Sequence, residues 1–537
     1  MEFDGATVER LGPLQIVGNV RLDARWDLWR SLPNAGGAHS DLALCLHAYA
    51  AWGESFVDRL SGDFCFALWD DTRRCLIAVR DRLGIRPLFH ASVGGEVLVS
   101  DSLDWIMAHD AVPTDLDDVW IGDFLTVGFG LDFDRTVRRH IRRVPPAHLL
   151  KIADGRETVR RYWQLEIAEP LHFKDRRVYT ERFLELVDTA IKDRLPPGRI
   201  GISMSGGLDS TMLAACTVAA VGDPARVIGE CHHFERLMPD EEAHFGTLAA
   251  RHLGIELRLQ AADDLVYDSQ WRERGLRTAE PTLTIVQAHP GATTARAMAA
   301  DAGVWFFGEG PDNALAFDRD PYFAWLVSRR DWWGLAGVLL DYVRVKGLSG
   351  WRATVARRLV PHHAGLSATT GVPAWIDPDF ARRVGLPERL QALGASAHPW
   401  HPQAVGSFES AIWPALFDDL RYAEACGPFE WRHPFLDLRV LEYMMALPPV
   451  PWAWRKHLLR KAMADRLPPA ILARDKTALA RQPLLAVWGE QGLPSLSGSS
   501  RLAPYVTAAE LPPHQPMPAN PDCVVAAHAL DHWLVQE

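Results

Sequence analysis

The chain has 537 residues, of which 48% are hydrophobic and 23% charged, the composition of an ordinary globular protein with room for about two to four domains. Its formal net charge of −11 at pH 7 argues against a non-specific nucleic-acid or membrane-surface partner. The sequence has no run of about 20 apolar residues and no positively charged, apolar N-terminal segment, so we expect a cytoplasmic protein. The seven cysteines lack metal-ligand spacing and are typical of reduced thiols.

Residues 1 to about 160 alternate short apolar runs with turn signals, which predicts an α+β unit. The clearest helix covers residues 41–52, because its apolar residues recur at helical spacing. The predicted strands include Leu14–Val17, Phe64–Trp69, Cys75–Val79 and Val97–Val99. We place a first domain at residues 1–163, followed by a connection over residues 164–174.

From residue 176 the pattern changes to strands that alternate with helices, which is typical of a doubly wound parallel sheet. The predicted strands are Ile200–Met204, Val227–Gly229, Ile255–Leu259 and Val304–Phe307, and the predicted helices cover residues 178–193, 211–216, 240–252 and 292–301. This second domain spans residues 176–490 and is mostly helical after residue 320. Residues 491–537 are predicted to form a loose C-terminal tail that ends in a short helix.

A group of tryptophans lies in the helical part of the second domain: Trp325, Trp332, Trp333 and Trp351. Aromatic side chains dominate protein cores, so we predict that these residues pack helices together. An aromatic wall for a peptide substrate is the alternative interpretation.

The most informative stretch is Ser205-Gly206-Gly207-Leu208-Asp209-Ser210, between a predicted strand and a predicted helix. A strand, a glycine turn and a helix N-terminus form an anion site in which backbone N–H groups approach phosphate closely. The carboxylate of Asp209 suits such a site only if Mg²⁺ lies between it and the phosphate oxygens. The Gly-x-x-x-x-Gly-Lys-Ser/Thr loop does not occur in the sequence. The stretch is similar to the pyrophosphate loop of enzymes that split ATP into AMP and pyrophosphate.

A second loop, Gly308-Glu309-Gly310-Pro311-Asp312-Asn313, follows the predicted strand Val304–Phe307. Ligands of a doubly wound sheet bind at the carboxyl ends of its strands, so this loop should face the same crevice. Asp312 would then complete a two-carboxylate Mg²⁺ site with Asp209, and Glu309 would lie nearer the reacting carbonyl. Without the first loop, both acids are better explained as helix N-terminal residues favoured by the macrodipole.

Together the motifs resemble those of the asparagine synthetase superfamily across most of residues 176–485. Two further motifs complete the resemblance: Arg432-His433-Pro434-Phe435-Leu436-Asp437 and Arg474-Asp475-Lys476. The resemblance implies a doubly wound, HUP-like ATP pyrophosphatase domain with ATP and Mg²⁺ as cofactors. In the implied reaction ATP adenylates a carboxylate, pyrophosphate leaves, and a nitrogen nucleophile displaces AMP to give an amide. Ser205 to Ser210 and Gly308 would bind ATP and pyrophosphate, Lys476 would stabilise developing negative charge, and Glu309 would accept the proton of the nucleophile.

The first domain resembles the family's N-terminal-nucleophile glutaminase but lacks its nucleophile. A working glutaminase needs a cysteine directly after the initiator methionine, and its own α-amine acts as the base. Position 2 is Glu2, and the first cysteine is Cys45. The resemblance itself rests on Ser40-Asp41, Leu60–Leu68, Arg80–Leu88 and Val144–His148. We therefore expect a degenerate domain that releases no ammonia from glutamine, so the nitrogen would come from the substrate itself.

Two branches of the family use an amine of the substrate, the beta-lactam synthetases and the lasso peptide cyclases. Gly308 to Leu315 lacks the Asp-Glu-x-x-Gly-Gly-Tyr continuation of asparagine synthetases and is similar to the lasso cyclase variant. We therefore expect macrolactam formation, in which an Asp or Glu side chain of a precursor peptide is adenylated and joined to the peptide's N-terminal amine. This resemblance implies a leader-binding protein and a leader peptidase as partners. An ammonia-dependent asparagine synthetase, a beta-lactam-type small-molecule ligase and a non-catalytic scaffold remain alternatives.

Overall fold

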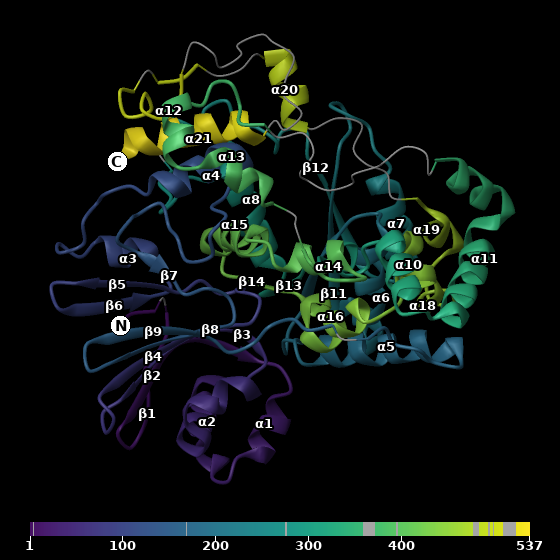
Figure 1. Ribbon diagram of the computed structural model, residues 1–537, viewed down its shortest axis with the longest axis horizontal. Coiled ribbons are helices and arrows are strands. Elements are labelled where there is room, and N and C mark those ends of the chain that lie inside the picture. The colour runs from purple at the N-terminus through teal and green to yellow at the C-terminus, as the bar shows by residue number, and fades with distance from the viewer. Residues whose placement is uncertain are drawn as a thin grey trace.

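Three sheets and the helices around them build the part of the chain that the structure describes (Figure 1). The structure is a computed structural model, and it describes residues 1–3, 5–167, 169–273, 276–357, 371–393, 396–475, 483–491, 495–497, 499–507 and 522–537. Among the described helices, none combines the length and apolar composition needed to cross a membrane.

The first half of the α/β fold is a six-stranded antiparallel sheet with the order β1-β2-β3-β4-β8-β9. Its strands are β1 (Glu9–Leu11), β2 (Leu14–Leu22), β3 (Gly62–Asp70), β4 (Cys75–Arg80), β8 (His148–Ala153) and β9 (Arg156–Arg161). A smaller antiparallel sheet has the order β6-β5-β7, with β5 (Phe89–Val93), β6 (Glu96–Ser100) and β7 (Arg142–Arg143). The strands predicted in this region are all present.

Alternating side chains of β3 divide the core of this unit between two faces. Phe64, Phe66 and Leu68 pack in one cluster with helix α2 (Asp41–Trp52), whereas Cys65 and Ala67 pack in another with residues of β6. This period of two is what a strand buried on both faces requires. The other helices here are α1 (Arg25–Ser31), η1 (Ala35–Gly37), η2 (Gly53–Arg59), α3 (Leu103–Met107) and α4 (Asp118–Val127).

Helix α2 has the bounds that the sequence predicts. It begins after Ser40, whose Oγ accepts a hydrogen bond from the backbone N–H of Ala43 at 2.9 Å. Such an N-cap satisfies one of the backbone donors that a helix start leaves free.

The second half is built around a five-stranded parallel sheet with the order β12-β11-β10-β13-β14. Its strands are β10 (Ile200–Met204), β11 (Val227–His233), β12 (Glu256–Ala261), β13 (Val304–Phe306) and β14 (Glu430–Arg432). The chain winds in one direction from β10 to β12 and in the other from β10 to β13 and β14. In such a sheet, the point where the order reverses forms a crevice at the carboxyl ends of the central strands. The parallel, doubly wound sheet is the one predicted, although β14 is an addition, because its one apolar residue lies between Glu430 and Arg432 and gives no apolar run.

Helices surround this sheet and form most of the chain after residue 320, as predicted. The helix before the first strand is α5 (Arg176–Lys192), and those between the first four strands are α6 (Leu208–Val221), η3 (Pro224–Arg226), α7 (Glu242–Leu253), η4 (Leu283–Gln287) and α8 (Ala288–Asp301). The next are α9 (Pro311–Ala314), α10 (Arg319–Ser328), α11 (Trp332–Arg357), α12 (Pro378–Arg383), α13 (Leu386–Gln391), α14 (Pro402–Phe408) and α15 (Ile412–Cys426). The last are η5 (Pro434–Leu436), α16 (Leu438–Met445), α17 (Pro449–Trp452), η6 (Trp454–Lys456), α18 (His457–Ala462), α19 (Pro469–Ala473), α20 (Pro483–Gln491) and α21 (Asp522–Gln536).

Helix α21 is buried, which corrects the expectation of a loose tail. It packs in one apolar cluster with α4, where Leu530 and Trp533 contribute from α21 and Phe124 contributes from α4 (Figure 1). The sequence from Cys523 to Leu534 is apolar on nearly every side, and a helix of that kind needs cover all round. The predicted short helix is therefore present, but it belongs to the core.

The tryptophan group of the second domain divides between packing and exposure. Trp325 of α10 packs against Tyr322 and Trp400, with ring centroids 5.9 and 6.3 Å away. Trp332 and Trp333, at the start of α11, are 60% and 90% exposed. The prediction of helix packing is therefore correct for Trp325 and wrong for these two, and the side chain of Trp351 lies outside the described residues.

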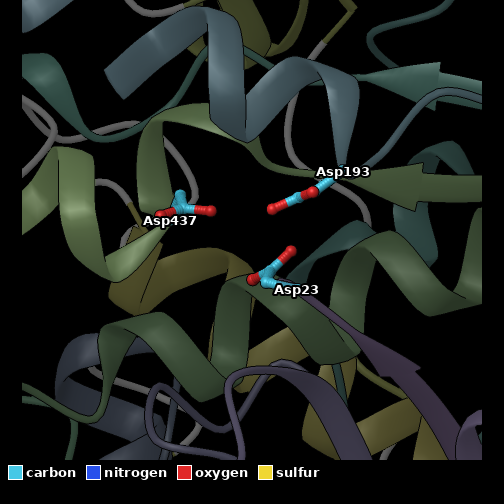
Figure 2. Close-up of side chains that lie close together, drawn as sticks. All are labelled: Asp23, Asp193 and Asp437. Carbon is cyan, nitrogen blue, oxygen red and sulfur yellow. The ribbon is translucent and has the colours of Figure 1, made fainter. Parts of the chain in front are cut away.

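A buried arginine joins the two halves of the fold. Arg194, just after α5, donates to Asp23 at 2.8 Å and to Asp437 at 2.7 Å, and the three side chains are almost fully buried. Asp193 completes the group, and Figure 2 shows the three carboxylates pointing toward one another. Arg439 donates to Asp193 at 2.6 Å and to Asp437 at 2.7 Å. Burial alone would raise the pKa of Asp437, but Arg439 and Arg194 outweigh it and hold that pKa below its ordinary value.

Replacing Arg194 with methionine should destabilise the protein by about 3 kcal/mol, because Asp23 and Asp437 would lose their shared buried cation. Arg177→Met is the matched control, since Arg177 pairs with Asp175 at the exposed start of the same helix and should contribute little. Urea unfolding followed by tryptophan fluorescence measures both changes. Equal unfolding midpoints for Arg194→Met and the wild type would contradict a stabilising role for this arginine.

Candidate functional site

The glycine loop between β10 and α6 is closed by its own serines. The backbone N–H of Ser205 donates to Ser210 Oγ at 2.9 Å, and the two hydroxyl oxygens lie 3.0 Å apart. The backbone N–H of Gly207 donates to Ser205 Oγ at 3.1 Å. The loop therefore has a fixed shape at the start of α6, at the carboxyl end of the central strand, where the crevice was predicted.

Gly206 is required at its position by close packing. A Cβ on this residue would lie 2.4 Å from Nη1 of Arg474 and 2.5 Å from Cβ of Phe245. Real Cβ atoms do not approach other atoms so closely, so any side chain here would displace the arginine or the loop. The guanidinium of Arg474 also lies over the ring of Phe245, 4.5 Å from its centroid.

A carboxylate contacts the backbone of the loop. Glu242, at the start of α7, accepts a hydrogen bond from the Gly206 N–H at 2.5 Å and another from Arg474 Nη2 at 2.6 Å. One anionic group is thus held by a backbone N–H and a guanidinium, the two kinds of donor that also bind phosphate. Neither residue was a predicted site residue. Glu242 lies at a helix start, and Arg474 belongs to the motif Arg474-Asp475-Lys476, in which only Lys476 was given a role, so the sequence does not reveal their contact with the loop.

The two predicted metal ligands, Asp209 and Asp312, approach one another. Asp209 lies in the first turn of α6 and Asp312 in the first turn of α9. Both form ion pairs with Nζ of Lys456, and the distance to Asp312 Oδ1 is 2.6 Å. Burial alone would lower the pKa of Lys456, but the two carboxylates outweigh it and raise that pKa, so the amine is an ammonium ion. The structure thus places the positive charge of Lys456 between Asp209 and Asp312, the two residues predicted to bind Mg²⁺.

Asp209 and Asp312 have the right chemistry for that metal. Carboxylate oxygens are the ligands that Mg²⁺ prefers, and one or two of them usually hold the ion next to substrate phosphates. That a single ammonium group reaches both carboxylates shows that one small cation can bridge them. Mg²⁺ held there would supply positive charge opposite the phosphates of ATP.

Lys456 is directed into the crevice by an unusual backbone turn. Arg455 and Lys456 both have left-handed backbone angles, with φ values of 47° and 54°. Each such non-glycine residue costs of order 1 kcal/mol, and the cost persists only where surrounding contacts fix the conformation. This strain lies immediately before α18 and next to the ion pairs of Lys456.

The other residues predicted for this site are Gly308, Glu309 and Lys476, and the structure describes the first two. Gly308 lies against the start of α6, since a Cβ there would be 3.5 Å from Cα of Ser210. Glu309 is half-buried in the loop between β13 and α9. Lys476 lies outside the described residues, so its predicted role stays a prediction.

The motif from Arg432 to Asp437 supports the site from outside, through contacts with Arg194 and Gly310. Arg432 ends β14 and donates to the backbone oxygen of Arg194 at 2.7 Å, and Asp437 belongs to the buried arginine network described above. Leu436 lies between them and borders Gly310, where a Cβ would meet its Cδ2 at 3.0 Å. Gly310 has φ 124°, a conformation that favours glycine. This motif therefore positions the loop that carries Asp312.

A separate cavity of about 620 Å³ lies between the two halves of the fold, and its lining includes none of the glycine-loop residues. Arg143 lines this cavity and forms ion pairs with two other lining residues, Glu280 and Asp418, the latter at 2.6 Å. Burial raises the pKa of Asp419, another lining residue, to about 6. The lining of this cavity combines paired charged groups with apolar side chains such as Phe89 and Trp120, and it is distinct from the site of Asp209 and Lys456.

The described cysteines of the first half are buried thiols. Burial raises the pKa of Cys45 well above its ordinary value and also raises that of Cys75. Burial and the nearby charge of Asp101 raise the pKa of Cys65 to about 12. The thiolate is the nucleophilic form, so none of these three side chains is a nucleophile near neutral pH.

Known families match both halves of the chain. A family model described as "Glutamine amidotransferase domain" matches residues 30–163, and one described as "Asparagine synthase" matches residues 182–488. Asparagine synthetase [glutamine-hydrolyzing] 3 of Bacillus subtilis is 32% identical, over 82% of this chain and 70% of its own length. Amidase chyE of Penicillium rubens is 25% identical, over 76% of this chain and 66% of its own length.

More distant similarities were also found. Asparagine synthetase [glutamine-hydrolyzing] 2 of Bacillus subtilis is 23% identical, over 81% of this chain but only 58% of its own length. Among solved structures, a glutamine phosphoribosylpyrophosphate amidotransferase from B. subtilis covers 51% of this chain and 53% of its own, with 16% identity and a TM-score of 0.20. That score is too low to support any structural argument.

Gly206→Ala should weaken ATP binding at least tenfold, because the new methyl group overlaps Arg474 and Phe245 and distorts the loop. Gly291→Ala is the control: that glycine lies in α8 with open space around its Cβ position, and alanine favours a helix. Equilibrium binding of a fluorescent ATP analogue measures both variants. Unchanged affinity in Gly206→Ala would show that the loop does not contact the nucleotide.

The family assignment rests on sequence matches that agree with the geometry. The "Asparagine synthase" model covers more than half of the chain, and it contains the glycine loop, Asp312 and Lys456. The crevice lies at the carboxyl ends of parallel strands, where a nucleotide-splitting enzyme of this architecture binds its ligand. The chain therefore belongs to the asparagine synthase family and is an ATP-dependent carbon–nitrogen ligase.

Proposed function

We propose that this protein is a macrolactam synthetase of the lasso peptide type, which forms an amide within one precursor peptide. An Asp or Glu side chain of the peptide reacts with ATP to give an acyl adenylate and pyrophosphate. The freed N-terminal amine of the same peptide then attacks the acyl carbon and displaces AMP. The observation that carries the proposal is the contrast between a charged, ordered crevice in the second half and buried, protonated thiols in the first.

Residues of the crevice have distinct roles in this proposal. We assign the parallel sheet to the HUP type, with the loop from Ser205 to Ser210 around the leaving pyrophosphate and Gly308 beside it. Asp209 and Asp312 would hold Mg²⁺, which supplies charge against the phosphates. Glu309 would take the proton of the attacking amine, and Lys476 would stabilise negative charge on the acyl group.

The source of nitrogen separates this proposal from glutamine-dependent synthesis. A glutaminase domain needs a reactive cysteine, whereas Cys45, Cys65 and Cys75 are buried with raised pKa values. An amine that is part of the substrate needs no such cysteine. It also reacts at a high effective concentration, because the acceptor carboxylate and the amine belong to one bound molecule.

The proposal includes partners. A leader peptidase must free the amine before ring closure, and a leader-binding protein would deliver the precursor. The exposed Trp332 and Trp333 offer an apolar surface on the second half that suits a peptide or its carrier.

A second candidate is intermolecular amide synthesis with ammonia or a free amine. Three relatives favour keeping it: two carry the name asparagine synthetase, and one carries the name amidase. Two substrate pairs distinguish this candidate from peptide cyclisation: aspartate with ammonium, and aspartate with glutamine. Formation of asparagine from either pair at a rate above that of peptide cyclisation would favour this candidate.

Incubation of the protein with ATP, Mg²⁺ and a leader-free peptide should yield AMP, pyrophosphate and a product lighter by one water. Asp209→Asn should abolish the product, because the carboxylate that faces the phosphates is lost. Asp188→Asn, on the partly exposed side of α5, should leave the rate unchanged. Mass spectrometry and nucleotide chromatography give the readouts, and formation of ADP in place of AMP would overturn the mechanism.

Cys65→Ala should retain cyclisation within about twofold, because a buried thiol with a pKa of about 12 takes no part in an intramolecular reaction. Added glutamine should leave the rate unchanged for the same reason. The cyclisation rates of wild type and variant, each with and without glutamine, provide the measurement. Acceleration by glutamine that disappears in Cys65→Ala would contradict an internal source of nitrogen.

A further inference from the structure

Two acidic side chains share one cation in the crevice. Lys456 Nζ pairs with Asp209 and with Asp312, and the side chains of Lys456 and Asp209 are 18% and 16% exposed. The side chain of Asp312 is 39% exposed, so Asp209 is the carboxylate that is largely removed from water. Two carboxylates this close are unfavourable unless a positive charge lies between them. Lys456 supplies that charge from within the chain.

The backbone commits Lys456 to this position. Arg455 and Lys456 are the one adjacent pair of non-glycine residues with positive φ in the part of the chain that the structure describes. The backbone N–H of Lys456 donates to the backbone oxygen of Ala453 at 3.0 Å, and the side chain of Arg455 pairs with Asp475. Strain of this kind is kept at functional sites, where it directs a side chain that an ordinary helix start would point elsewhere.

An anion site lies beside this cation. Asp209 belongs to the first turn of α6, and in the glycine loop before it the backbone N–H of Gly206, together with the guanidinium of Arg474, holds the carboxylate of Glu242. Phosphates bound to that loop would bring negative charge to the same crevice. The flexible four-carbon stem of a lysine lets its ammonium group exchange a carboxylate partner for a phosphate partner.

We propose that Lys456 acts as a built-in counter-cation, which occupies the place of Mg²⁺ between Asp209 and Asp312 until ATP arrives. When ATP binds, the ammonium group moves to the phosphates, and the two carboxylates become available to the metal ion. Mg²⁺ alone then binds weakly, because it must enter beside an existing positive charge. Nucleotide and metal bind with positive coupling, and by linkage each strengthens the other by the same factor. This inference rests on the proposed metal site, and it adds that ATP must bind before Asp209 and Asp312 become available to Mg²⁺.

Calorimetric titration of Mg²⁺ into the full chain without nucleotide tests the inference directly. Lys456→Met should bind Mg²⁺ at least tenfold more tightly than the wild type, because the competing charge is gone. Lys456→Arg keeps a cation at this position and should stay near the wild type. Lys461→Met is the matched control, since Lys461 is exposed on α18 and outside the crevice. Equal or weaker Mg²⁺ binding in Lys456→Met would overturn the proposal.

A measurement on the wild type keeps the test valid if Lys456→Met does not fold. The affinity for Mg²⁺ should rise at least tenfold when α,β-methylene-ATP is present, and an unchanged affinity would overturn the proposed coupling.

Adding Asp209→Asn to Lys456→Met should remove the gain in Mg²⁺ affinity. If the gain persists, the metal binds elsewhere and the metal-site assignment fails as well. If Lys456→Met gains affinity for Mg²⁺ but the wild type cyclises no peptide, the inference about Lys456 stands and only the assigned substrate is wrong.

Discussion

Arg194 fixes the geometry on which the crevice depends. Its guanidinium binds Asp23 from the first half of the chain and Asp437 from the second, and its backbone oxygen accepts from Arg432 at the end of β14. Buried ion pairs of this kind add little net stability over a well-packed apolar contact, but they tolerate only one arrangement of their partners. Between Arg432 and Asp437 the chain presents Leu436 to Gly310, the close contact that sets the loop of Asp312. The position of a metal ligand thus depends on an arginine outside the crevice.

The charged groups of the crevice are paired with one another. Glu242 pairs with Arg474 next to the loop backbone, and Lys456 pairs with both Asp209 and Asp312, so these five groups keep a net negative charge. Groups arranged in this way are already oriented, so binding of ATP need only exchange partners. Preorganised charges of this kind lose little reorganisation energy during the reaction, which is why electrostatic sites are effective in catalysis.

Most of the fold follows from local sequence patterns, and part of the site does not. The strand, glycine turn and helix from Ile200 to Val221 were predictable, because their apolar spacing and their two adjacent glycines are encoded within about twenty residues. Lys456 was not predictable as a partner of Asp209, because the two residues are 247 positions apart and meet through a left-handed turn that lysine rarely adopts. The short β14 and the burial of α21 were missed because each depends on a distant partner. The apolar character of α21 on nearly every side was nevertheless present in the sequence and indicates a buried helix.

The packing of α21 against α4 also has a consequence for synthesis of the chain. The cluster around Phe124 in the first half is completed by Leu530 and Trp533, residues about 400 positions later. Domains of large proteins begin to fold while translation continues, and exposed apolar surface during that time favours aggregation. This cluster cannot be completed until α21 has left the ribosome.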